Sequence, residues 1–415
     1  MFKKILALFL TLGLLTAPLA GCRQTASLSP DKELLQADFS QIQKEARGQT
    51  VAIYMWGGDE SVNRYMDEWV APRVEKELGI KLKRVPINDA REMINKLLTE
   101  KEAGKTKGSI DIMWINGENF KLAKDNDLLW GPFVDKLPNY NRYIDGEDYQ
   151  IKYDFGEDTE GLEAPWGKAQ FVFIYDSNKI ASPPDTVEAL KAWIKDNPGR
   201  FTYPAPPDFT GSAFIRQILA GVSSNYDRYL TASLDRESLE TEITPLWDYL
   251  NQIKPYLWQK GITYPENIAK LNELYAQGEV YMTMSYNPNY ADNMIKQGRF
   301  PATTRTFVLK NGSLANTHYL AIPFNAPHKA GAMAVIDYLL SFEAQLAKFD
   351  PANWGDGLAI SLAKLSPEEK EKLKQIKPGK AALSPEELEK YKLPELSGAY
   401  VDIIEEGWFN HVAKN

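Results

Sequence analysis

The stretch Gly278-Glu279-Val280-Tyr281-Met282-Thr283-Met284-Ser285-Tyr286-Asn287-Pro288-Asn289-Tyr290 begins as an apolar segment and ends in a polar turn. Its valine, tyrosine and threonine are residues that strands favour, and Asn-Pro-Asn is typical of a turn. In α/β proteins, a buried strand that ends in aromatic and amide side chains forms one wall of a ligand cleft. We therefore expect Tyr286, Asn287 and Tyr290 to face a cleft, although Tyr290 can instead begin the core face of the next helix.

A matching wall is expected at Trp56-Gly57-Gly58-Asp59, which follows the apolar run 51–56. The segments after it alternate regularly between helix and strand patterns. Residues 60–78 carry apolar side chains at helical spacing, residues 80–85 are expected to form a second strand, a second helix follows Asn88-Asp89, and residues 110–115 are expected to form a third strand. This alternation predicts a doubly wound α/β unit with a parallel sheet.

Ligands of doubly wound units lie beyond the carboxyl ends of the strands. This rule selects the loops Trp56–Asp59 and Asn116–Asn119, and in the second loop it selects Glu118 and Asn119. Each acidic or amide residue has a competing interpretation as a helix cap, because Asp and Asn commonly accept hydrogen bonds from the first helical N–H groups. Asp59 can contact a ligand or only cap the helix that follows.

The second half of the chain repeats the pattern of strands, loops and helices. Trp166 precedes a buried strand over residues 171–175, and a short strand is expected over residues 201–204. Thr210-Gly211-Ser212 then opens an apolar helix. Free N–H groups at a helix N-terminus favour an anionic or strongly polar ligand group, whereas simple capping by Thr210 is the structural alternative.

The N-terminus has the pattern of an export signal. Lys3 and Lys4 precede an apolar run over residues 5–15 that is too short to span a membrane, and small residues lead to Cys22, the single cysteine. Leu19-Ala20-Gly21-Cys22 resembles the bacterial lipobox, which implies cleavage before Cys22 and lipidation of its side chain. An ordinary signal peptide cut near Ala20, with Cys22 as a free thiol, is the alternative.

Composition and motifs limit the function classes. The chain has 415 residues, 44% of them hydrophobic, and a net charge of −8 without a basic run, which argues against nucleic-acid binding. None of the three histidines lies in a His-Glu-x-x-His pattern, and there is no Gly-x-Ser-x-Gly elbow or Walker loop. We expect no cofactor, no metal and no enzymatic activity. A surface-anchored hydrolase using paired carboxylates and a purely structural lipoprotein remain as alternatives.

The order of these features resembles the extracellular solute-binding proteins of bacterial ABC importers, with the type II fold. Gly278–Met284 looks like the Gly-Glu-Val-Ala-Met strand of sugar-binding members, and Trp56–Asp59 with Asn63-Arg64-Tyr65 and Trp69 looks like the YnjB-like branch. The resemblance implies two doubly wound α/β lobes joined by crossing hinge strands, with hinges near Gly167–Phe171 and Pro301–Arg305. The expected division is a signal peptide (1–21), a tether and leading helix (22–49), lobe 1 (50–168), lobe 2 (169–302), the return to lobe 1 (303–345) and a C-terminal helical segment (346–415).

By the same resemblance, the protein is a monomeric receptor that delivers a small-molecule ligand to an ABC permease and its ATPase. It would be lipid-anchored at the outer face of the cytoplasmic membrane or in the periplasm. The implied contact residues are Trp56, Gly57, Gly58, Asp59, Glu118, Asn119, Trp166, Thr210, Gly211, Ser212, Tyr286, Asn287 and Tyr290.

The aromatic and acidic side chains of this set favour an organic cation or a heteroaromatic compound, thiamine-like or polyamine-like. A sugar is the alternative for the same fold. A ferric ion fits less well, because three residues separate Tyr286 from Tyr290.

Overall fold

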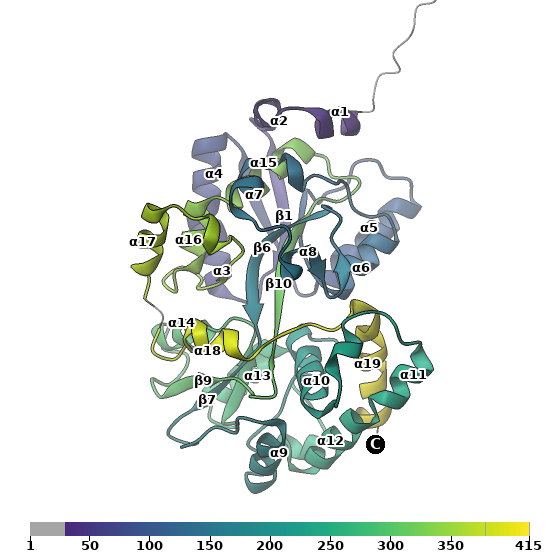
Figure 1. Cartoon of the computed structure of the whole chain (residues 1–415), viewed down its shortest axis with the longest axis vertical. Helices are drawn as coiled ribbons and strands as arrows, with labels where there is room; N and C mark the ends of the chain where they lie inside the picture. The colour runs from purple at the N-terminus through teal and green to yellow at the C-terminus, as the bar shows by residue number, and fades with distance from the viewer. Residues whose placement is uncertain (1–29, 378, 415) are drawn as a thin grey trace, which may run out of the picture.

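The computed structural model describes residues 30–377 and 379–414, and in this part of the chain two α/β lobes are joined by long strands (Figure 1). Lobe 1 is built on a large mixed sheet and lobe 2 on a smaller antiparallel sheet. This is the fold class predicted from the sequence. Cys22 and the predicted signal peptide lie outside the described residues.

The large sheet of lobe 1 has the strand order β11-β6-β10-β3-β1-β2, with β12 paired to β10. Strands β1 and β2 are parallel, as are β1 and β3, whereas β10 runs antiparallel to β3 and β6. In β1 the alternate residues Val51, Ile53 and Met55 are fully buried, as expected of a central strand. The strand bounds are β1 Thr50–Trp56, β2 Lys81–Ile87, β3 Ile112–Ile115, β6 Glu163–Gln170, β10 Ser313–Ala321, β11 Gly357–Leu358 and β12 Lys392–Pro394.

Helices cover both faces of this sheet and bury two apolar clusters against it. The predicted long helix over residues 60–78 exists but changes type within its length, from α3 through a π-helical turn to α4, and Gly79 ends it with a positive φ of 68°. The elements of lobe 1 are α1 Pro30–Gln36, α2 Phe39–Ala46, α3 Glu60–Arg64, η1 Tyr65–Val70, α4 Ala71–Leu78, α5 Ala90–Glu102, α6 Glu118–Asp125, η2 Val134–Lys136, α7 Pro138–Tyr143, α8 Tyr149–Lys152, β4 Tyr153–Asp154, β5 Glu157–Asp158, α15 Lys329–Leu339, α16 Phe342–Phe349, η6 Leu362–Lys364 and α17 Pro367–Lys374.

Lobe 2 has the antiparallel sheet β8-β7-β9, and its helices enclose a third apolar cluster. Its strands are β7 Val172–Asp176, β8 Met282–Ser285 and β9 Thr304–Phe307. Its helices are α9 Val187–Asp196, α10 Phe209–Val222, η3 Tyr226–Tyr229, α11 Arg236–Glu242, α12 Thr244–Ile253, η4 Lys254–Tyr256, η5 Trp258–Gly261, α13 Ile268–Ala276, α14 Tyr290–Lys296, α18 Pro385–Lys390, η7 Gly398–Tyr400, α19 Val401–Trp408 and η8 Phe409–Ala413.

Two local predictions for lobe 2 were wrong. Residues 201–204 do not form a strand; they are buried as irregular chain, where Phe201 O accepts a hydrogen bond from Trp258 N. The strand expected from Gly278 begins only at Met282, because Gly278 adopts a positive φ of 73° and closes the turn after α13. In both cases the local composition favoured a strand, but packing against the neighbouring helices gives the segment another conformation.

The crossing between the lobes is made by β6 and β10, which run between the two bodies in Figure 1. Strand β6 ends at Gln170, within the predicted hinge segment Gly167–Phe171, and β7 begins at Val172 in lobe 2. The return was expected to begin at residue 303, with a hinge at Pro301–Arg305. That prediction was wrong, because Thr304–Phe307 pairs with β7 inside lobe 2 and β10 makes the crossing instead.

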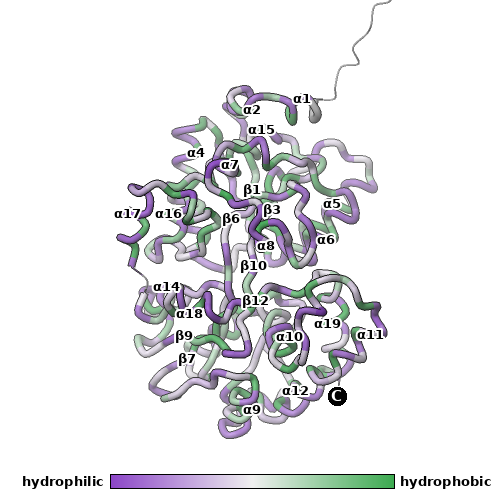
Figure 2. The backbone as a smooth tube through the Cα atoms, in the orientation of Figure 1, coloured by the Kyte–Doolittle hydropathy of each residue, from purple (hydrophilic) through white to green (hydrophobic). Residues whose placement is uncertain are grey.

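The C-terminal part was expected to form a separate helical segment, and this prediction was wrong. Residues 392–394 add a strand to β10, and α19 buries Ile404 and Trp408 in the core of lobe 2. The chain thus crosses between the lobes a third time. Helices α17 and α18 are hydrophilic (Figure 2), and Ser366 and Ser384 accept hydrogen bonds as their N-caps, as their Ser-Pro-Glu-Glu sequences predict.

Candidate ligand-binding site

A cavity of about 250 Å³ lies between the lobes. Lobe 1 contributes the loops that follow β1, β2 and β3, lobe 2 contributes the start of α10 and the exit of β8, and the crossing strands contribute Ala169, Asn316 and His318. The position agrees with the rule that sites form at the carboxyl ends of parallel strands. Of the predicted contact residues, those that line this cavity are Trp56, Gly58, Asp59, Glu118, Asn119, Thr210, Tyr286, Asn287 and Tyr290.

The indole of Trp56 lies over Gly58. A Cβ atom on Gly58 would come within 2.3 Å of Trp56 Cζ2, so the absence of a side chain makes room for the ring at the cavity wall. Gly57 does not line the cavity; its N–H donates to Ile87 O and its α-carbon packs against Pro86. One glycine of the pair therefore positions the aromatic wall, and the other joins β1 to β2.

Asp59 is both a helix cap and a cavity residue. Its Oδ1 accepts hydrogen bonds from Ser61 N at 2.7 Å and Val62 N at 3.4 Å, which satisfies the start of α3. Burial raises the pKa of this carboxyl, and the two N–H groups oppose that shift. The two interpretations of the sequence are therefore compatible.

Glu118 is the first residue of α6, and Gly117 precedes it with a positive φ of 63°. Its Oε1 accepts a hydrogen bond of 3.0 Å from Asn119 Nδ2, while Oε2 is buried without a protein partner. The pKa of Glu118 is raised to about 7: burial raises it most, Arg216 and Arg91 lower it, and nearby Glu405 raises it. Near pH 7, Glu118 is thus present in both its charged and its neutral form at the lobe interface.

The start of α10 differs from the prediction. Asp208 is the N-cap, and its Oδ1 accepts the Gly211 N–H at 2.8 Å while Oδ2 accepts the Ile268 N–H at 3.0 Å. Thr210 lines the cavity, but Gly211 and Ser212 lie behind it. The cap is therefore Asp208 and not Thr210, and its carboxylate accepts the Gly211 N–H that was expected to be free for a polar ligand.

Tyr286 belongs to a buried polar network behind the cavity wall. Its hydroxyl donates a short hydrogen bond to Glu395. Glu395 forms a bidentate ion pair with Arg216, with 3.0 Å from Nε to Oε2 and 3.1 Å from Nη2 to Oε1. Arg216 also donates to Ser212 Oγ at 2.8 Å. The ring of Tyr286 faces the cavity beside Phe209, with 5.3 Å between ring centroids. Ser212 therefore supports the wall from behind.

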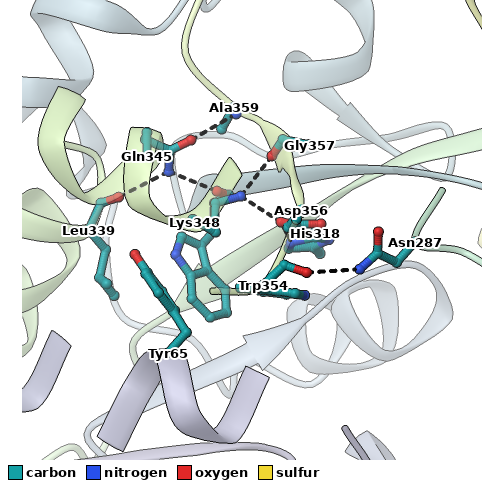
Figure 3. Close-up of polar contacts among 12 residues, drawn as sticks. Tyr65, Asn287, His318, Leu339, Gln345, Lys348, Trp354, Asp356, Gly357 and Ala359 are labelled. Carbon is teal, nitrogen blue, oxygen red and sulfur yellow. Dashed lines mark hydrogen bonds and ion pairs between the residues drawn. The ribbon is translucent and has the colours of Figure 1, made fainter. Parts of the chain in front are cut away.

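Asn287 and Tyr290 both line the cavity, and each has a protein partner. Asn287 Nδ2 donates to Trp354 O at 3.5 Å, across the two lobes (Figure 3). The Tyr290 hydroxyl accepts a hydrogen bond of 3.0 Å from Asn272 Nδ2, and Tyr290 is also the first residue of α14. As the sequence allowed, Tyr290 begins that helix.

Trp166 is fully buried and does not line the cavity. It packs with an aromatic group that does line it, namely Trp114, His318 and Trp354, at centroid distances of 5.2, 5.9 and 5.1 Å. The prediction that Trp166 faces the cleft was wrong, because β6 turns this side chain into the core of lobe 1. His318 is mostly buried but reaches the cavity wall.

A buried ion pair supports this aromatic group. Lys348 Nζ lies 2.5 Å from Asp356 Oδ2, and His318 Nε2 lies 2.9 Å from the same oxygen (Figure 3). Burial alone would raise the pKa of Asp356, but His318 and Lys348 together hold it below its usual value. Asp356 is therefore a charged group at the cavity wall whose charge is locally balanced.

Several cavity residues were not anticipated. Asp89 follows β2 and caps α5, so the carboxyl-end rule could have selected it. Phe209 and Asp208 immediately precede the Thr210 turn. The sequence has no local signal for residues that reach the site from the C-terminal part of the chain, which are Trp354, Asp356 and Glu405.

Comparison with known proteins agrees with the geometry. The family model for bacterial extracellular solute-binding protein matches residues 69–373. A relative, Protein YnjB of Escherichia coli strain K12, is 39% identical over 343 residues, which is 82% of this chain and 87% of that protein. The chain belongs to the bacterial extracellular solute-binding proteins. The family predicted from the sequence is thereby confirmed, and a family of binding proteins does not favour the hydrolase alternative.

Solved structures show the same fold for this solute-binding protein. The spermidine/putrescine ABC transporter substrate-binding protein PotD of Streptococcus pneumoniae superposes with a TM-score of 0.59 at 18% identity, covering 88% of this chain and 100% of that one. The periplasmic binding protein AfuA of Actinobacillus pleuropneumoniae, with fructose-6-phosphate bound, gives a TM-score of 0.60 at 15% identity, covering 88% and 99%. No helix among residues 30–377 and 379–414 of this solute-binding protein is long and apolar enough to cross a membrane.

The cavity of this solute-binding protein is rich in carboxyl groups. Arg91 is the arginine that lines it, and its guanidinium is already paired with Asp402 at 2.8 Å. The acidic residues that line it are Asp59, Asp89, Glu118, Asp208, Asp356 and Glu405. Four of these carboxyl groups, at Asp59, Glu118, Asp208 and Glu405, have pKa values raised mainly by burial, so a positive charge in the cavity would stabilise their ionised forms.

Proposed function

We propose that this protein is the substrate-binding receptor of an ABC importer and that its ligand is a small organic cation or a positively charged heteroaromatic compound. The acidic lining of the cavity is the observation that carries this proposal. A polyamine-like or thiamine-like compound combines positive charge with a size suited to about 250 Å³. The name of PotD links a protein of the same fold to spermidine and putrescine.

Aromatic faces would complement the charge. Trp56, Trp114, Phe209 and Tyr286 line the cavity, and a cation over such a ring gains ~0.5–2 kcal/mol. The same rings would stack on a flat heterocycle. Glu118 is the best-placed counter-charge, because its Oε2 has no protein partner and a buried carboxylate without one is costly.

Other ligand classes fit this lining less well. A sugar phosphate needs cationic or N–H donors, yet Arg91 is engaged by Asp402 and the α10 N-terminus by Asp208. A ferric ion would need ionised phenolates, but burial raises the pKa values of Tyr286 and Tyr290, and both hydroxyls are hydrogen-bonded. A neutral sugar, which aromatic rings and carboxylates also bind, is the alternative that the experiment must test.

Native mass spectrometry of the purified protein, followed by calorimetry, tests the ligand class. The panel is spermidine, putrescine, thiamine, glucose and fructose-6-phosphate. We expect a cation to bind with micromolar or tighter affinity and to quench tryptophan fluorescence, because Trp56 and Trp354 line the cavity. Selective binding of glucose or fructose-6-phosphate would overturn the cation proposal while leaving the receptor function intact. Turnover of the bound compound would instead support the hydrolase alternative.

We also propose that residues 1–21 are removed on export and that Cys22 carries the lipid anchor, so that the receptor meets its permease at the membrane. Several acyl chains on one residue give stable anchoring, whereas one chain does not. A Cys22→Ser variant should appear in the soluble fraction after cell fractionation, and mass spectrometry should find diacylglycerol on the wild-type N-terminal peptide. A variant that stays in the membrane fraction would refute lipid anchoring.

A further inference from the structure

A short segment of lobe 1, residues Trp354–Gly357, reaches across to lobe 2 beside the cavity; it is called the clasp below. We propose that the clasp holds the cleft closed, and that Asn289, Asn293 and Lys348 are positioning residues for ligand binding that act through it. None of these three side chains is among the residues that line the cavity. The proposal concerns closure of the lobes and does not depend on the chemical class of the ligand.

On the lobe 2 side, the clasp accepts hydrogen bonds from asparagine amides. Asn293 Nδ2 donates to Trp354 O at 2.6 Å, and Asn289 Nδ2 donates to Gly355 O at 2.7 Å. Asn287 adds a longer bond of 3.5 Å to Trp354 O. Asn293 lies within α14 and is 3% exposed, so its bond is shielded from water. Backbone carbonyls of one lobe are thus bound by side chains of the other.

On the lobe 1 side, the clasp is fixed by the buried cluster of Lys348, Asp356 and His318. The ammonium of Lys348 donates to Asp356 Oδ2 at 2.5 Å and to Gly357 O at 2.7 Å. The Lys348 carbonyl also accepts the N–H groups of Gly355 at 2.9 Å and Asp356 at 3.1 Å. The clasp is therefore held to the end of α16 by main-chain bonds and by the side-chain bonds of Lys348, which Figure 3 shows.

The cluster lies directly on a crossing strand. A Cβ atom on Gly167 of β6 would come within 2.5 Å of polar atoms of Asp356, His318 and Lys348. Gly167 pairs with His318 of β10, where the register of the two strands shifts. Only a residue without a side chain leaves room for the cluster at this point of the hinge. The clasp is thus attached to lobe 1 close to the point about which the lobes would rotate. Opening the cleft would therefore break the hydrogen bonds from the lobe 2 asparagines to the clasp, whereas the cluster of Lys348, Asp356 and His318 would remain intact.

Trp354 connects closure to the ligand. Its indole lines the cavity and stacks on His318 with 6.0 Å between centroids, while its carbonyl accepts the Asn293 amide. A ligand that packs on this indole would favour the state in which the carbonyl is bound, because both belong to one residue. Loss of the asparagine bonds should therefore speed ligand release more than it slows ligand capture.

The test compares wild-type protein, the double variant Asn289→Ala/Asn293→Ala and the control Asn141→Ala. Asn141 donates to Asp135 O at 2.9 Å within lobe 1 and is exposed, so its loss removes a similar bond away from the lobe interface. Small-angle X-ray scattering without ligand should give a larger radius of gyration for the double variant alone. With spermidine, the double variant should bind about tenfold more weakly, mainly through faster dissociation.

The Asp356→Asn variant tests the other side of the clasp. It should open the cleft as the double asparagine variant does, and the triple variant should add little, because the substitutions break one chain of contacts. If Asp356→Asn does not fold, the double variant decides the question alone. An unchanged radius of gyration in the double variant would overturn the proposal. Failure of wild-type protein to bind spermidine would count against the cation proposal only, since the scattering comparison needs no ligand.

Discussion

Arg91 on α5 and Asp402 on α19 meet at the mouth of the cleft, with 2.8 Å between Nη2 and Oδ1. Their side chains are 40% and 57% exposed, so the lobes are joined here by an ion pair in contact with water. A second pair, Glu60 with Arg299 at 3.9 Å, also spans the lobes. Exposed pairs of this kind stabilise weakly and are screened by salt.

We predict that Asp402→Asn weakens spermidine binding about two- to fivefold at low ionic strength and that the effect disappears at roughly 0.5 M salt. The substitution removes a negative charge near the cleft and leaves Arg91 unpaired. Calorimetry at both salt concentrations measures it. The control is Glu406→Gln on the same helix, because Glu406 pairs with Arg236 of its own lobe at 2.9 Å. A loss that persists at high salt would contradict this account.

Glu118 should make cation binding depend on pH. Its pKa is raised from 4.5 to about 7, so in that window the folded protein holds a proton that the unfolded chain has released. Its contribution to stability therefore falls as pH rises from about 4.5 to about 7. The affinity for a cation changes with pH in the opposite direction, because the cation binds the ionised carboxylate of Glu118. We predict that affinity for spermidine rises as pH increases through about 7.

The Glu118→Gln variant should bind more weakly at pH values above about 7 and show a flatter profile. The matched control is Asp337→Asn. Burial raises the pKa of Asp337 to about 6, but this residue lies in an outer groove of lobe 1 and accepts hydrogen bonds from Asn139. Its substitution should leave the binding profile as in the wild type. A wild-type profile in Glu118→Gln would exclude Glu118 as the counter-charge.

Trp56 and Tyr286 should respond differently to removal of their rings. Trp56 is half-buried over Gly58, so Trp56→Ala should cost ligand affinity with a small change in melting temperature. Tyr286→Ala removes a hydrogen bond donor to Glu395 within a buried network, so it should lower both affinity and melting temperature. Differential scanning fluorimetry with and without spermidine separates the two effects. Equal losses of stability would show that Trp56 is mainly structural.

The sequence predicted the strand ends of lobe 1 well, because a short apolar run followed by glycine or asparagine is a local signal. Trp56 and Asp59 at the end of β1, and Glu118 after β3, were located in this way. Asp59 also shows why a cap and a site residue cannot be separated by sequence: the same carboxylate accepts from Ser61 N and faces the cavity.

Trp166 and the return crossing show where local signals fail. Whether Trp166 faces the cleft or the core depends on the register of β6 against β10, which is set by contacts about 150 residues apart. Trp354 and Glu405 reach the cavity only because the C-terminal part of the chain crosses both lobes. Such placement depends on tertiary packing, which composition and periodicity do not encode.

Lys348 and Lys310 form ion pairs of the same length in different surroundings, and this allows a matched test. Each Nζ lies 2.5 Å from an aspartate oxygen, but the Lys348–Asp356 pair is 0% and 4% exposed whereas Lys310–Asp185 is 58% and 45% exposed. Removing one member of a buried pair leaves an uncompensated charge, which costs about 3–5 kcal/mol. We predict a loss of this size in the free energy of unfolding for Lys348→Met, measured by urea denaturation, and little change for Lys310→Met.

The double variant Lys348→Met/Asp356→Asn should recover part of the loss in the free energy of unfolding, because it also removes the carboxylate that Lys348→Met leaves without its lysine. If Lys348→Met and Lys310→Met unfold at the same urea concentration, burial does not govern this pair and the anchoring role of Lys348 is wrong.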